Sequence, residues 1–316
     1  PGGIRDHAGY EHAEDAKGGG MEYYVERGYV PEGIEGSGMH KDGAAMTLEY
    51  AYQDWCLAQM AKSMGKKDDY DLFMLRSKSY RNLFNLEENI IHPKNKDGTW
   101  IEEFEIVSEK FNTKGFCESN AAVYSNYAPQ DMSGLIGLFG GNEKYANFLN
   151  RLFLKDEPNR FVPPNSRSHA ATYVGYDNQP GTAMAHLFNY AGHPWLTQKW
   201  VRKVKDLTFG GTTPYSGYNG DEDQGQMGAL GVLMAIGIFE VRGGAAVEPR
   251  YEITSPIFDR VTIKLDNKYY PGNTFTIKTA NNNADNMYVQ SASLDRKPLH
   301  TFWFPHRDFA AGSTLT

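Results

Sequence analysis

The spacing of apolar residues changes once along this chain, after Gly243-Gly244. Before these glycines, apolar residues recur every three or four positions, which is the spacing of helices that bury one face. After them, short segments alternate apolar and polar residues as strands do, and Asn- and Gly-rich stretches separate the segments. The sequence therefore predicts a mainly helical region over residues 1–245 and a small β-rich region over residues 246–316.

Successive helix pairs are expected in the helical region. The predicted helices span residues 44–64, 68–84, 120–139, 142–154, 180–192, 194–207 and 224–239. Pro129 should break or kink the third helix, because proline has no N–H to donate. Helix pairs of this length favour a bundle or an α/α toroid. In the β-rich region, the predicted strands span residues 260–265, 274–279, 287–292 and 300–304.

Charge, hydropathy and cysteine content exclude several classes of protein. The net charge of −7 argues against nucleic-acid binding through a basic surface. No apolar run reaches the roughly 18 residues that a membrane-spanning helix needs. Cys56 and Cys117 are too few for a disulfide framework and lack the spacing of metal ligands. Aromatic residues make up 13% of the chain, which suits stacking on sugar rings but equally suits a packed core.

Both ends of the sequence read as internal. The first residues, PGGIRDHAGYEHAED, have neither an initiator Met nor the basic and apolar regions of a signal peptide. The last residues, AAGSTLT, stop within what reads as a strand. We therefore expect this chain to be part of a longer protein, and the sequence leaves the compartment open.

Three polar stretches each precede or open an expected helix. They are FCESNAAVYSNYAPQD (116–131), GYDNQPGTAMAHLFNYAGHPWLTQKW (175–200) and NGDEDQGQM (219–227). Each could simply cap its helix, because carboxylate and amide oxygens accept from the free N–H groups of a first turn. Three adjacent carboxylates, however, repel one another. Together the stretches favour a shared pocket in which a carboxylic acid and an opposed carboxylate hydrolyse a glycosidic bond.

These stretches, together with TLEYAYQDWCLAQMAKSMGK (47–66), resemble motifs of the α-mannosidases of glycoside hydrolase family 92. The resemblance covers nearly the whole chain. It implies an (α/α)6 toroid, incomplete here, followed by the small β-rich region. It also implies an exo-acting, inverting, calcium-dependent enzyme that hydrolyses terminal α-mannosides of N-glycan or mannan type. An N-terminal β-sandwich would pack against the toroid, with the active site between them, and that domain is absent from this sequence. Secretion or export to the periplasm is expected.

The resemblance also implies catalytic roles. Glu118 opens the motif whose Glu is the general acid of the family. Asp221 and Asp223 lie in the motif whose acidic residues serve as general base. Calcium would hold two hydroxyls of the terminal mannose and help to distort its ring, although the resemblance assigns no ligands to it. Glu222 is expected to face elsewhere, because alternate residues of an extended segment point oppositely.

Substrate-binding residues are expected at Asn120, Asn178 and Gln179. Family members that cleave α-1,2 linkages carry a His-Glu pair where this chain has Asn178-Gln179, so its linkage preference is expected to differ. The usual Pro-His-Asp of the first motif is Pro-Gln-Asp here, and Gln130 removes a titratable group. These departures leave open a non-catalytic glycan-binding relative, or an inactive fragment of such an enzyme. A helical-toroid polysaccharide lyase would need a Tyr/His or Arg constellation that the sequence does not clearly supply.

The tryptophans and histidines within these stretches are expected to be structural. Trp55, Trp195 and Trp200 lie on helix faces and should be core residues. His186 and His193 should pack or cap rather than bind a ligand. Cys117 lacks a paired His signature, so nucleophilic catalysis by its thiol is not expected.

Overall fold

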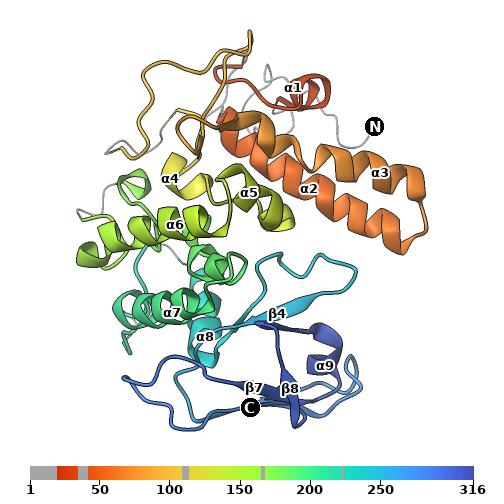
Figure 1. Ribbon diagram of the computed structural model, residues 1–316, viewed down its shortest axis with the longest axis vertical. Helices are drawn as coiled ribbons and strands as arrows, with labels where there is room; N and C mark the ends of the chain where they lie inside the picture. The colour runs from red at the N-terminus through yellow and green to blue at the C-terminus, as the bar shows by residue number, and fades with distance from the viewer. Residues whose placement is uncertain are drawn as a thin grey trace. The chain divides into compact units, whose positions relative to one another are not determined.

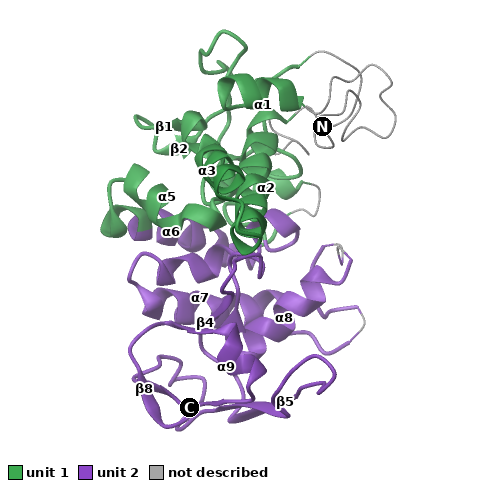
Figure 2. Cartoon of the chain, turned by 90° about the vertical axis from the view of Figure 1, so that its right-hand side faces the viewer, with its two compact units in different colours: residues 1–145, 162–175 green, residues 146–161, 176–316 purple. Residues whose placement is uncertain are grey.

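The computed structural model of this chain describes residues 20–34, 42–108, 114–164, 168–213, 215–220, 222 and 224–316 (Figure 1). Its contacts form two compact units (Figure 2). Unit 1 comprises residues 1–145 and 162–175, and unit 2 comprises residues 146–161 and 176–316. These units do not test the predicted domain boundary at residue 245, which stays a prediction.

Unit 1 is mainly helical. Its elements are α1 (Met21–Arg27), α2 (Gly43–Ser63), α3 (Lys67–Arg76), the 3-10 helix η2 (Ser79–Leu83), β1 (Phe84–Asn85), β2 (Ile90–Ile91), α4 (Ala121–Tyr124), the 3-10 helix η3 (Pro129–Asp131), α5 (Met132–Leu138) and the 3-10 helix η5 (His169–Ala171). The predicted pairing of the first two long helices is confirmed, because α2 and α3 pack against each other. The predicted break at Pro129 is also confirmed, because α4 ends before it and α5 begins after it.

Helix α6 (Asn142–Asp156) runs from unit 1 into unit 2. The other helical elements of unit 2 are the 3-10 helices η4 (Glu157–Asn159), η6 (Gln179–Gly181) and η7 (Met184–Asn189), with α7 (Pro194–Thr208), α8 (Gln226–Ile236) and α9 (His306–Ala310). Helix α7 begins at Pro194 as predicted. Helix α8 ends at Ile236, three residues earlier than predicted, and Gly237 is its C-cap. This glycine has φ +83°, and an added Cβ would lie 2.6 Å from the Pro256 nitrogen.

The predicted helix over residues 180–192 is wrong, since the segment forms η6 and η7 instead. Side chains take two of the N–H groups that an α-helix would bond to its own carbonyls. The Ala185 N–H donates to the Tyr176 hydroxyl at 2.8 Å, and the Asn189 N–H donates to the Thr197 hydroxyl at 3.2 Å. These tertiary contacts favour the tighter 3-10 turns.

Two small sheets complete unit 2. The strands are β3 (Ile238–Phe239), β4 (Arg250–Ile253), β5 (Arg260–Lys264), β6 (Thr274–Lys278), β7 (Ala292–Leu294), β8 (Lys297–Leu299), β9 (Trp303–Pro305) and β10 (Thr314–Leu315). One sheet has the order β3-β4-β9, and the other has the order β5-β6-β10-β7-β8. All pairs are antiparallel except β10 with β6.

The strand predictions succeed in part. The predicted strands over 260–265 and 274–279 are confirmed as β5 and β6. The prediction over 287–292 is wrong, because side chains occupy its backbone groups. The Val289 N–H donates to Gln198 at 3.0 Å, and the Met287 carbonyl accepts from the Ser255 hydroxyl at 2.6 Å. The strand in this part of the chain, β7, begins only at Ala292. The strand predicted over 300–304 is found as β9, from Trp303.

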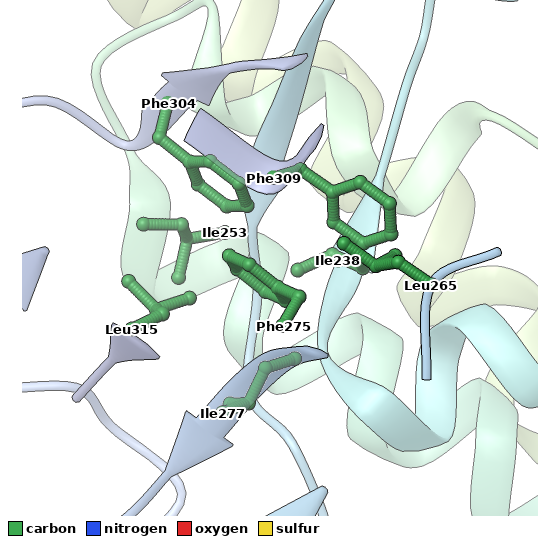
Figure 3. Packing of buried hydrophobic residues seen from close by; sticks show 8 residues of the cluster. All are labelled: Ile238, Ile253, Leu265, Phe275, Ile277, Phe304, Phe309 and Leu315. Atoms are coloured by element: carbon green, nitrogen blue, oxygen red, sulfur yellow. The ribbon is translucent and has the colours of Figure 1, made fainter. Parts of the chain in front are cut away.

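Unit 2 has two aromatic cores. In the β region, Phe275 is fully buried and its ring lies 5.4 Å from that of Phe304 and 4.8 Å from that of Phe309 (Figure 3). Among the helices, Phe153 stacks on Trp200 at 5.0 Å, and the Trp200 indole N–H donates to Asn150 at 2.8 Å. Both cores bury large apolar areas, which drives folding.

Two of the three tryptophans expected in the core are buried, and one is exposed. Trp55 is 5% exposed and Trp200 is 0% exposed, so both predictions are confirmed. Trp195 is 49% exposed, so its prediction is wrong; it lies in the first turn of α7, next to Pro194. The two histidines are structural as expected. His186 is buried and stacks on Phe239, and His193 precedes α7 and bonds the Ala191 carbonyl through Nδ1 at 2.8 Å.

Candidate active site

Glu118 lies in a turn of unit 1 that leads from the buried Phe116 into helix α4. Its side chain is partly buried. Its backbone has φ +50°, in the left-handed region that few residues other than glycine adopt. Such a conformation costs about 1 kcal/mol; eight other non-glycine residues in the described part of the chain share it, and strain of this kind recurs at functional sites. The strained turn therefore agrees with a functional role for the Glu118 carboxyl group.

Further acidic residues of unit 1 surround the neighbouring residue, Cys117. Burial, followed by the negative charges of Asp42 and Glu118, raises the pKa of the Cys117 thiol to about 12, and Glu49 adds to the rise. Burial also raises the pKa of the Glu32 carboxyl to about 7, with a further contribution from the charge of Asp42. At Glu32, burial therefore favours the protonated form of the carboxyl group.

Two tyrosines stand beside these carboxyl groups. The Tyr124 hydroxyl donates to the Cys117 carbonyl at 3.1 Å, and the Tyr127 hydroxyl donates to Glu49. Burial, followed by the nearby negative charges, raises the pKa of both phenols, so both stay protonated donors. The raised pKa of the Cys117 thiol also removes it as a nucleophile at neutral pH, because the thiolate is the reactive form.

Asn120 is fully buried, and its side-chain amide bonds backbone groups of unit 1. Its oxygen accepts from the Val123 N–H at 3.1 Å and caps α4. Its nitrogen donates to the carbonyls of Ala170 and Thr172 at 2.8 and 2.7 Å. These contacts fix the turn that carries Glu118. The expectation that Asn120 also binds substrate stays a prediction.

Gln130, which stands where the family usually has His, also makes a structural contact. Its amide nitrogen donates to the Ser77 carbonyl at 3.1 Å. The adjacent Asp131 caps α5 by accepting from the Gly134 N–H at 3.0 Å, and it also accepts from Tyr80 and Arg81. The motif thus ties the start of α5 to the end of the α3 region within unit 1.

Asn178 and Gln179 belong to unit 2, at the start of η6. The Asn178 side chain is buried, and its oxygen accepts from the Gln179 N–H at 2.9 Å. Gln179 is partly buried, and its backbone carbonyl accepts from the Thr182 hydroxyl at 2.9 Å. Asn178 therefore caps η6, as the capping alternative predicts. Substrate binding by Asn178 and Gln179 stays a prediction.

The second and third polar stretches meet within unit 2. The Gln226 amide donates to the Thr182 hydroxyl at 3.4 Å. At Gly220, with φ +76°, an added Cβ would lie 1.9 Å from the Asp177 carbonyl oxygen. The loop before α8 can pass this close to Asp177 only because residue 220 has no side chain. These two stretches are therefore neighbours, and a catalytic pocket shared by all three stretches stays a prediction.

Glu222 is the described member of the acidic triplet. Its carboxylate accepts from the Gly228 N–H at 3.3 Å, in the first turn of α8, and its carbonyl accepts from the Met227 N–H at 3.2 Å. A hydrogen bond to the same carboxylate raises the pKa of the Tyr218 phenol. The middle carboxylate therefore caps the helix. Asp221 and Asp223, the expected catalytic pair, lie outside the described residues.

Metal binding is addressed only by the part of the chain that the structure describes. There, no group of three or more His, Cys, Asp or Glu side chains is placed to hold a metal ion. In the same part, no helix is both long and apolar enough to span a bilayer.

The sequence analysis missed the acidic residues around Cys117. Asp42 is the residue directly before α2, and Glu49 lies within α2. Both precede Cys117 by some 70 residues along the chain. A signal was present, because Glu49 is a carboxylate within TLEYAY, among residues that pack as core. A carboxylate among core positions is rare unless it is paired or functional.

Comparison with known proteins gives consistent matches. The model of the glycosyl hydrolase family 92 catalytic domain matches residues 4–316. A family GH92 inverting mannosidase from Bacteroides thetaiotaomicron VPI-5482 is 31% identical, with a TM-score of 0.77 over 96% of this chain and 40% of that chain. A GH92 α-mannosidase from Bacteroides thetaiotaomicron, in complex with mannoimidazole, is 28% identical, with a TM-score of 0.80 over 93% of this chain and 38% of that chain.

A curated relative described as an uncharacterized secreted glycosidase, from Arthroderma benhamiae, is 28% identical over 324 residues. That match covers 94% of this chain and 38% of the relative. The chain therefore spans between 38% and 40% of the length of these three relatives.

Proposed function

This chain belongs to glycosyl hydrolase family 92, and on that premise we propose that it is the main part of the catalytic domain of an exo-acting, inverting α-mannosidase. Its substrates would be terminal α-mannosides of N-glycan or mannan type. The helices would belong to an (α/α)6 toroid, incomplete here, and an N-terminal β-sandwich of a longer protein would complete the pocket. The secreted relative supports secretion of that longer protein.

The observation that carries the proposal is the placement of Glu118. Glu118 is partly buried at a positive φ, and its charge acts on Cys117 and Tyr124 together with the charges of Asp42 and Glu49. An inverting glycosidase needs one carboxylic acid to protonate the departing oxygen and one carboxylate to take a proton from water. Glu118 would be the acid. Asp221 and Asp223 would supply the base, as the family motif implies.

The proposal is tested with Glu118→Gln in the intact protein. A glutamine cannot give a proton to the leaving group, so hydrolysis of a mannoside with a poor leaving group should fall by about a hundredfold or more. An activated aryl mannoside leaves without that proton, so its hydrolysis should fall much less. Glu87→Gln, at an exposed position of unit 1, is the matched control and should change neither rate.

Two results would contradict this assignment. Equal losses on both substrates would remove the acid role of Glu118, and release of α-mannose as the first sugar seen by proton NMR would exclude inversion. Absence of any hydrolysis by the wild-type intact protein would instead favour a non-catalytic glycan-binding relative.

The Asn178-Gln179 pair would shift the linkage preference away from α-1,2. An amide pair can donate and accept hydrogen bonds, but it carries no negative charge in place of the Glu found in α-1,2 enzymes. Relative values of kcat/KM on α-1,2-, α-1,3-, α-1,4- and α-1,6-linked mannobiosides would rank the linkages, with a phosphodiester-linked mannoside for comparison. A clear α-1,2 optimum would refute the inference.

Calcium dependence is also proposed. The acidic stretch offers carboxylate oxygens, the ligand type that Ca²⁺ prefers, although no ligand set can be assigned within the described residues. A bound calcium ion would hold hydroxyl groups of the terminal sugar. Chelation should abolish hydrolysis, added Ca²⁺ should restore it, and calorimetry should detect Ca²⁺ binding to the intact protein. Full activity after exhaustive chelation would refute the dependence.

A further inference from the structure

Unit 2 contains a cavity of about 800 Å³ in its β region. One wall is the loop of residues 279–291, between β6 and β7. The other wall is formed by Ser255 and Pro256, and the floor by residues of β4, β6, β7 and β10. This volume is within the range of small-molecule binding sites, roughly 300–1,000 Å³. No residue expected to act in catalysis lines the cavity.

The loop wall is held in place by side chains of the helical part of unit 2. Arg202 of α7 donates to Ser255 and Pro256, and also to the Asn282 side chain at 2.5 Å. Gln198 of α7 accepts from the Val289 N–H at 3.0 Å. The Ser255 hydroxyl donates to the Met287 carbonyl at 2.6 Å. The cavity is thus preformed by several independent contacts.

The lining combines an apolar floor with an amide-rich wall. Ile277 and Leu315 of the sheet are buried side chains on the floor. The loop wall contains four Asn and Gln residues: Asn281, Asn282, Asn286 and Gln290. Amides both donate and accept hydrogen bonds, as paired sugar hydroxyls require. Tyr288 is 44% exposed and adds an aromatic ring on which a sugar could stack.

The charge of the lining further narrows the ligand class. Among the residues that line the cavity, Lys278 and Asp285 carry the only charges, and these cancel. A site for phosphate, sulfate or a uronate would carry an excess of positive charge. We propose that this cavity is a non-catalytic site for a neutral saccharide. The choice of saccharide over other neutral ligands rests in part on the proposed glycosidase function.

The test measures binding and hydrolysis separately in the intact protein. Binding of neutral di- and trisaccharides of mannose, glucose and galactose is measured by calorimetry and by saturation-transfer NMR. Tyr288→Ala should weaken the best saccharide by about tenfold, which corresponds to about 1.4 kcal/mol. The matched control is Tyr269→Ala, because Tyr269 is 71% exposed in the same β region but does not line the cavity. It should leave binding unchanged.

Hydrolysis distinguishes this site from the catalytic one. Tyr288→Ala should leave kcat/KM on a small aryl α-mannoside unchanged and raise KM on polymeric mannan. Three results would overturn the inference: no saturable saccharide binding, equal effects of Tyr288→Ala and Tyr269→Ala, or a parallel loss on the aryl mannoside. Saccharide binding that depends on Tyr288 in a protein that hydrolyses no mannoside would support the inference while refuting the proposed function.

Discussion

Replacing Glu252 by Gln should change how the stability of the protein depends on pH. Glu252 lies on β4 and is 0% exposed. It accepts from the Tyr190 hydroxyl and from the Val241 N–H at 3.2 Å, and its carboxylate lies 3.6 Å from the Arg250 guanidinium. Burial outweighs these contacts and raises the pKa of Glu252 from 4.5 to about 7.

The sign and size of the effect follow from that pKa. Between pH 4.5 and pH 7 the folded protein holds a proton at Glu252 that the unfolded chain has lost. The free energy of unfolding therefore falls as pH rises through this window. At about 1.4 kcal/mol per pH unit, the shift amounts to about 3 kcal/mol, most of which is lost between pH 5 and pH 8.

Glutamine resembles the protonated carboxyl group but does not ionise. The free energy of unfolding of Glu252→Gln, relative to wild type, should therefore rise by about 2–3 kcal/mol from pH 5 to pH 8. Urea denaturation followed by circular dichroism, at pH 5, 6, 7 and 8, measures this difference. Glu248→Gln, at an exposed position between β3 and β4, is the matched control and should follow wild type. Parallel pH profiles for wild type and Glu252→Gln would refute the reasoning.

Three further predictions concern stability. Phe275→Ala should lower the free energy of unfolding by about 3–5 kcal/mol in urea, because it empties the centre of the β-region core; a loss below about 1 kcal/mol would contradict that packing. Asn120→Ala should lose three hydrogen bonds, and Asn120→Asp should also turn a buried carboxylate oxygen toward two carbonyl oxygens, so both should melt below wild type; equal melting temperatures would contradict it. Gly220→Ala should destabilise more than Gly65→Ala, because both glycines have positive φ but only Gly220 meets a backbone atom, Asp177 O; equal effects in thermal melting would show that the close approach is absent.

The sequence predicted best where local signals and tertiary contacts agree. Helix α7 begins at Pro194, whose fixed φ and missing N–H suit a first helical turn. β5 alternates exposed and partly buried residues as its sequence predicts, and β6 buries the Phe275 and Ile277 side chains of its alternating pattern, although Thr276 between them is buried too. Prediction failed over 180–192 and 287–292, where side chains from outside each segment bond its backbone groups. The periodicity of apolar residues does not predict that the Thr197 hydroxyl bonds the Asn189 N–H, or that the Gln198 amide bonds the Val289 N–H.

In the candidate site, too, local motifs could be predicted from the sequence and tertiary contacts could not. The motif containing Glu118 can be found from its residues alone, and the capping reading of the acidic triplet correctly anticipates Glu222. The cluster of Asp42 and Glu49 with Cys117 depends on contacts across some 70 residues, which a single sequence does not reveal. The exposure of Trp195 could not be read either, because helical spacing does not say whether a neighbour covers that face.

The positive φ of Glu118 has a consequence for engineering an inactive form of the protein. At φ +50°, a glycine would relieve a strain of about 1 kcal/mol that any other side chain retains. Selection for thermal stability alone would therefore favour glycine at this position, and would erase the carboxyl group while improving the fold. Stabilised libraries of this protein should be sequenced at position 118 before loss of activity is attributed to any other substitution. For trapping an uncleaved substrate, Glu118→Gln is preferable to Glu118→Gly, because it keeps both the turn and a hydrogen-bonding side chain in place.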